Sequence, residues 1–71
     1  MTVTPTQAQK ILTGNSTFSQ LGFSMLLTRL KRVYSKDPSH ASLQKCTAEI
    51  NTFLKKYAPI MAPDFAIISK L

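Results

Sequence analysis

The sequence has no tryptophan, one cysteine, two glycines and three acidic residues among its 71 positions. The single Cys46 cannot form a disulfide within the chain, and it leaves too few ligands for a structural zinc site. A lone cysteine also favours a reducing compartment, so we expect a cytoplasmic protein. Chains of this size that lack disulfides and metals commonly gain stability by oligomerisation. Self-association or a bound protein partner is therefore expected.

Long apolar runs are also missing from the chain. The longest, such as residues 25–27 and 65–68, are far shorter than the roughly 18 residues that a membrane span needs. The first seven residues contain no basic cluster followed by an apolar segment, so we expect no secretory signal and no membrane span.

The groups that catalysis requires are scarce. His40 and Cys46 are six positions apart, which on a helix separates them by about 120° and roughly 9 Å, too far for a dyad within one chain. The acids Asp37, Glu49 and Asp64 are scattered, and no Gly-rich phosphate loop or paired metal-ligand motif is present. We expect no enzymatic activity, no cofactor, no metal site and no small-molecule substrate.

Hydrophobic residues make up 44% of the chain despite a formal net charge of +6, a balance typical of folded domains. Their spacing follows a helical period. We predict one all-α domain, 1–71, a small bundle of three to four helices built on a central antiparallel helical hairpin. The predicted helices cover residues 5–13, 17–36, 38–57 and 63–71.

Capping and proline signals predict the ends of the short helices. For helix 5–13, Thr4 and Pro5 are typical of a helix start and Gly14 of a helix end. For residues 63–71 the apolar pattern favours a helix, with an extended segment as the alternative.

The starts of the long helices are predicted by the same signals. Thr17 with Gln20 three residues later is typical of a capping box. Pro38 disfavours helical backbone at the residue before it, so the hairpin bends there. Asp37 is the expected N-cap of the second long helix, with Ser39 as the alternative.

Each long helix carries one broad apolar arc. Antiparallel packing of the two arcs places Phe23 near Leu54 and Gly22 beside Phe53 or Tyr57. The predicted arcs consist of Phe23, Leu26, Leu27, Leu30, Val33 and Tyr34 on the first helix and Leu43, Cys46, Ile50, Phe53, Leu54 and Tyr57 on the second.

The first long helix also carries a second surface, apolar in its first half and cationic in its second, which we call the outer stripe. The simplest explanation is structural: a short helix covers the apolar half, and the cations sit near a helix C-terminus because the helix dipole favours them there. Glu49 is expected to face away from the seam. The outer stripe consists of Phe18, Leu21, Met25, Arg29, Arg32 and Lys36.

Functionally, the outer stripe indicates a non-enzymatic protein-interaction module, such as an adaptor, regulator or accessory subunit, that self-associates or binds a protein partner. The alternative is a basic accessory protein that contacts nucleic-acid phosphates non-specifically. The nearly direct joining of two long helices is unlike a helix-turn-helix. Tyr34 and Tyr57 lie on the core arcs, which disfavours base stacking.

Overall fold

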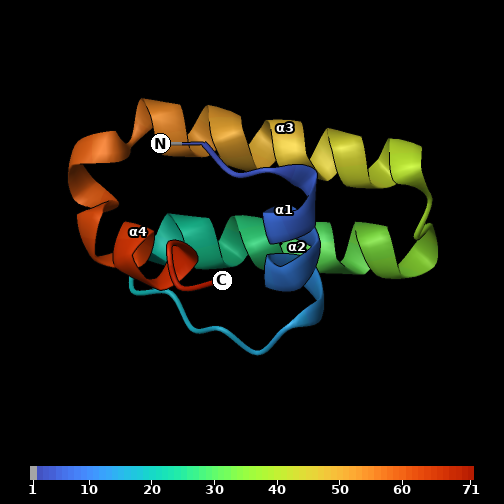
Figure 1. The fold of residues 1–71 in the computed structure, drawn as a ribbon, viewed down its shortest axis with the longest axis horizontal. Helices are drawn as coiled ribbons and strands as arrows, with labels where there is room; N and C mark the ends of the chain where they lie inside the picture. The colour runs from blue at the N-terminus through green and yellow to red at the C-terminus, as the bar shows by residue number, and fades with distance from the viewer. Residues whose placement is uncertain (1) are drawn as a thin grey trace.

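Two long antiparallel helices joined by a short bend form the frame of the computed structural model, which describes residues 2–71 (Figure 1). Its elements in chain order are α1 (Pro5–Thr13), α2 (Leu21–Lys36), α3 (His40–Lys56), the 3-10 turn η1 (Ala58–Ile60) and α4 (Ala62–Ile68). No strand occurs among these residues. The predicted all-α helical bundle is confirmed.

The first helix begins and ends at the residues expected from its caps. Thr4 Oγ1 accepts a hydrogen bond from the Gln7 amide at 3.2 Å, and Gln7 Oε1 accepts one from the Thr4 amide at 2.9 Å. At the other end the Gly14 amide donates to the Lys10 carbonyl. These reciprocal bonds satisfy backbone groups that a short helix would otherwise leave without partners.

The second helix begins four residues later than predicted. Gln20, not Thr17, is its N-cap, and Gln20 Oε1 accepts from the Phe23 amide at 2.6 Å. The reason is tertiary: Asp64 Oδ1 accepts from the amide and the hydroxyl of Ser19 at 2.7 and 2.8 Å, and Asp64 Oδ2 accepts from the Gln20 amide at 3.0 Å. Asp64 thus holds the chain in a non-helical path just before α2.

The bend between the long helices also differs in detail from the prediction. Ser39, the alternative cap, accepts from the Ser42 amide at 3.1 Å and starts α3. Asp37 instead closes α2, because its amide donates to the Val33 carbonyl at 3.1 Å. Near the C-terminus the predicted helix is present and the extended alternative is not, but α4 begins at Ala62, ends at Ile68 and is followed by a turn at residues 69–70.

The core lies where the two apolar arcs meet α1 and α4. Gly22 packs beside Phe53, as expected, because a Cβ on Gly22 would lie 3.3 Å from the ring carbon Cζ of Phe53. Leu26 and Val33 depart from the predicted arc: Leu26 is half-buried and Val33 is 44% exposed. These two residues lie two turns apart along one side of α2.

The N-terminal segment is attached to α3 by a reciprocal pair of hydrogen bonds. The Val3 amide donates to Asn51 Oδ1 at 2.7 Å, and Asn51 Nδ2 donates to the Val3 carbonyl at 3.1 Å. Gln9 Nε2 donates to the Tyr34 hydroxyl at 3.2 Å, which ties α1 to α2 as well. As a result, α1 crosses the hairpin on one face (Figure 1).

The solvent-accessible surface is 4494 Å², close to the ~4400 Å² expected for a folded monomer of this mass. The chain therefore buries as much surface as an independent domain does. None of the helices in residues 2–71 is long and apolar enough to cross a membrane.

Replacing Asp64 with Ala should destabilise the fold by about 3 kcal/mol, or ~15 °C in Tm, because three hydrogen bonds to a buried carboxylate are lost. Thermal unfolding followed by circular dichroism measures this. Asp37→Ala is the matched control: Asp37 is exposed, so its removal should cost no more than about 0.5 kcal/mol. Equal melting temperatures of the two variants would contradict the role given to Asp64.

Candidate protein-interaction surface

The structure removes Phe18 from the outer stripe. Its side chain is 7% exposed, and its ring meets the ring of Phe23 edge to face at a centroid distance of 5.0 Å. Phe18 lies before α2 and not on it, so the helical spacing that placed it on the stripe does not apply. A buried side chain of this kind stabilises the fold and offers no surface to a partner.

The apolar half of the outer stripe is open to solvent. Leu21 is 73% exposed and Met25 is 65% exposed, and residues four apart on a helix are surface neighbours. The structural explanation, in which a short helix covers these residues, therefore fails. Arg32 and Lys36 extend the exposed stripe toward the end of α2.

Arg29 differs from the other cations of the stripe because it forms an ion pair across the hairpin. Its Nη2 lies 2.7 Å from Glu49 Oε1, with 57% and 45% of the two side chains exposed. Glu49 therefore bridges toward α2 and does not face away, contrary to expectation. Exposed pairs of this kind contribute little stability, about 0.2–1 kcal/mol. The main effect of the pair is on the distribution of charge, because Arg29 neutralises the carboxylate of Glu49.

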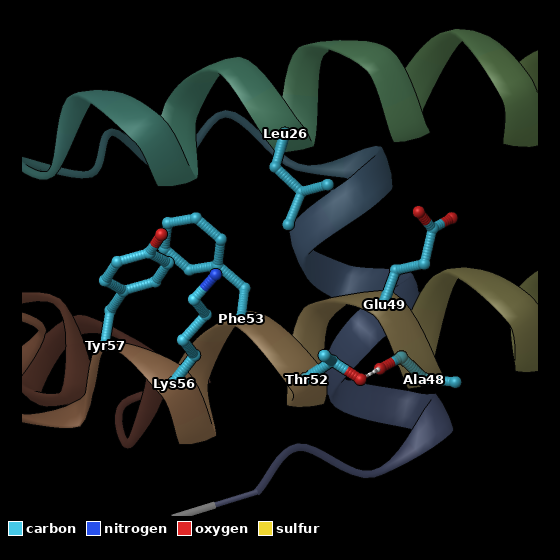
Figure 2. A pocket seen from close by; sticks show the side chains of 7 residues that line it. All are labelled: Leu26, Ala48, Glu49, Thr52, Phe53, Lys56 and Tyr57. Atoms are coloured by element: carbon cyan, nitrogen blue, oxygen red, sulfur yellow. Dashed lines mark hydrogen bonds between the residues drawn. The ribbon is translucent and has the colours of Figure 1, made fainter.

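A groove runs between α2 and α3 on the face of the hairpin opposite α1, which lies behind the two helices in Figure 2. Its volume is about 380 Å³, within the range typical of ligand-binding clefts. Leu26 reaches into it from α2, Tyr57 directly follows α3, and the other lining side chains come from α3 (Figure 2). The lining residues are Leu26, Ala48, Glu49, Thr52, Phe53, Lys56 and Tyr57.

The floor of the groove is aromatic and anchored in the core. The Phe53 ring lies 4.6 Å from the Tyr57 ring and 5.6 Å from the buried Phe23 ring, measured between centroids. Lys56 Nζ sits 5.4 Å from the centroid of the Tyr57 ring, within cation–π range. The groove thus combines a packed apolar floor with a cation at one rim.

Sequence reasoning assigned Leu26, Phe53 and Tyr57 to the core and missed the groove. All three are half-buried, packed on the core on one side and open on the other. One feature of the sequence could have predicted an uncovered face on the hairpin. The predicted short helices, about nine residues each, cannot cover both faces of a hairpin whose helices approach twenty residues.

A second cavity of about 370 Å³ lies on a different side of α3 and includes Lys55, the neighbour of Lys56. It is bounded by the N-terminal segment and the end of α3. Its lining residues are Thr2, Asn51, Thr52, Leu54, Lys55 and Ala58. Lys55 and Lys56 therefore point toward different cavities although they are adjacent in the chain.

The reactive side chains do not gather at either cavity. Burial, followed by the negative charge of Glu49, raises the pKa of the Cys46 thiol, while a hydrogen bond with Ser42 and the charge of Arg29 oppose the shift. His40 is exposed and contacts Gln44 through its ring Nε2 at 3.0 Å. Residues 2–71 contain no cluster of three or more His, Cys, Asp or Glu side chains able to hold a metal ion.

Compared with models of protein families, with curated proteins and with solved structures, the chain has no match.

The raised pKa of Cys46 predicts a loss of stability in alkali. The unfolded thiol, with a pKa of about 8.5, loses its proton before the folded one does, so unfolding becomes easier as pH rises between the two pKa values. Because one proton is involved, the slope cannot exceed about 1.4 kcal/mol per pH unit. Denaturant unfolding of the wild type and of Cys46→Ala, both under reductant, measures it. A stability difference between them that stays constant from neutral to alkaline pH would contradict the prediction.

Proposed function

We propose that this protein is a non-enzymatic protein-interaction module, an adaptor, regulator or accessory subunit. The partner binds the exposed part of the outer stripe together with the groove between α2 and α3, a surface that we call the outer face. The observation that carries the proposal is the exposure of three large apolar side chains on α2, Leu21, Met25 and Val33. Single exposed apolar residues are common, but Leu21 and Met25 are neighbours one turn apart, and Val33 lies two turns after Leu26 of the groove, on the same side of α2. Exposed apolar surface of this kind is typical of a docking surface.

The size of the surface is compatible with this role. A stable interface buries about 800 Å² on each partner, which is less than a fifth of the 4494 Å² that this chain exposes. The outer face spans both long helices of a molecule 31 Å in its longest dimension. A second copy of the chain or a different protein could supply the other half of such an interface.

Met25→Glu should weaken the interaction at least tenfold, because it places a charge where apolar surface is buried on binding. Light scattering over about a hundredfold range of protein concentration detects self-association, and affinity capture detects other partners. Gln44→Glu is the control, since it adds the same charge at an exposed position outside the outer stripe and the groove. If Met25→Glu and Arg29→Glu both leave the molar mass and the captured proteins unchanged, the outer face is not the interface.

A nucleic-acid-binding role is the second candidate. It is favoured by Arg32 and Lys36, which are exposed and have no acidic partner among residues 2–71. Binding of labelled DNA or RNA should then weaken steeply with salt, with a log–log slope of about −0.9 per neutralised phosphate. The double variant Arg32→Glu/Lys36→Glu should flatten that slope. Absence of binding at about 50 mM salt would eliminate this candidate.

A further inference from the structure

We infer that the groove between α2 and α3 binds an acidic amphipathic helix of a partner protein. The inference rests on the proposed function and names the chemistry of the partner. Three properties of the groove carry it: its shape, its apolar floor and the sign of the charge around it.

The shape fits a helix because the groove is formed by two antiparallel helices, with nothing from residues 2–71 laid over it (Figure 2). On the opposite face α1 crosses and contacts both long helices. A partner helix in the groove would cover the bare face of the hairpin. Helices bind such grooves through apolar side chains spaced at i, i+3 or i+4, and i+7.

The floor supplies the contacts that these anchors need. Leu26, Phe53 and Tyr57 present half-buried apolar surface, and the aromatic rings are held in place by the core residue Phe23. Ala48 and Thr52 form the wall along α3, and their small side chains let a helix approach closely. Because the floor is already packed, little side-chain ordering would oppose binding.

The charge around the groove selects an acidic partner. Lys56 lines the rim, and Arg29 is the one cation of the nine Lys and Arg residues that forms an ion pair within residues 2–71. Glu49, the carboxylate at the groove, is neutralised by that pair, while Asp64 is fully buried. Asp37 alone among the acids is left exposed outside an ion pair. The field at the groove is therefore positive.

The same charge disfavours a second copy of this chain as the occupant. Two copies docked by this face would place the Lys56 of each chain in one interface, between chains that each carry +6. Like charges placed together across an interface oppose association and suppress wrong partners. An acidic helix instead gains from both the apolar floor and the cationic rim.

A synthetic peptide tests the inference directly. The probe is a helix of about 18 residues, ~27 Å long, with leucines on one face and glutamates on the other. One control peptide carries lysine at every glutamate position, and another scrambles the order. Fluorescence anisotropy at low salt should show the acidic peptide binding at least tenfold more tightly than either control. Equal affinities of the acidic and basic peptides, or tighter binding of the basic one, would overturn the inference.

The position of the peptide-binding site is tested by a matched pair of variants and by NMR. Lys56→Glu should weaken binding of the acidic peptide about tenfold through charge reversal at the rim. Lys55→Glu, the same change one position earlier on a different side of α3, should weaken it less than threefold. In ¹⁵N-labelled protein, amide shifts on peptide addition should centre on Ala48, Phe53 and Lys56, which line the groove and not the second cavity. Shifts centred on α1 or α4, or equal effects of the two variants, would place the site elsewhere and overturn the inference.

Failure of this inference is distinguishable from failure of the proposed function. If no peptide binds while Met25→Glu still converts a self-associated protein to monomer, the interaction module stands, a second copy is its partner and the acidic-helix inference is wrong. If no peptide binds and Met25→Glu changes neither the molar mass nor the captured proteins, both proposals are wrong.

Discussion

The carboxylate of Asp64 is the interaction on which the arrangement of the short segments depends. It lies in the first turn of α4, is fully buried, and accepts three hydrogen bonds from Ser19 and Gln20, which immediately precede α2. One side chain thus joins the beginnings of two helices, where backbone amides lack partners and negative charge is favoured. Every buried side-chain polar atom in the described part of the chain has a partner. Within residues 2–71, no other hydrogen bond joins the segment between α1 and α2 to α4.

This interaction also explains why the molecule has one bare face. The bonds to Asp64 draw α4 toward the start of α2, and the bonds between Asn51 and Val3 hold the N-terminal segment and α1 across the hairpin. As a result, α1 and α4 both lie on one side of the hairpin. The other side keeps Leu26, Phe53 and Tyr57 half-covered and Met25 exposed. A chain of this length has too few residues to cover both faces of a hairpin whose helices contain 16 and 17 residues.

The candidate site was only partly predictable, and particular residues show why. Leu21 and Met25 lie well inside the first long helical pattern, so their periodicity correctly indicated an outward face. Phe18 was placed on that face by extending the helix through Thr17, a cap that is sound locally but is overridden by Asp64, 45 positions from Ser19. Glu49 was assigned to solvent by its azimuth on one helix, yet its azimuth also brings it within reach of Arg29 on the next helix. Single-helix periodicity contains no information about such cross-helix pairs.

By itself the sequence determined the all-α class, the hairpin and the ends of α1, because these follow from local signals: helical spacing of apolar residues, capping side chains and the bend at Pro38. The tertiary structure alone decided where α2 begins, which face the short helices cover, and which aromatic side chains remain half-exposed as the floor of a groove. Those outcomes depend on contacts between residues more than 40 positions apart, such as Ser19 with Asp64 and Val3 with Asn51. Local propensity cannot predict these contacts, because the donors that bond to a buried carboxylate are the ones that the folded chain brings close to it.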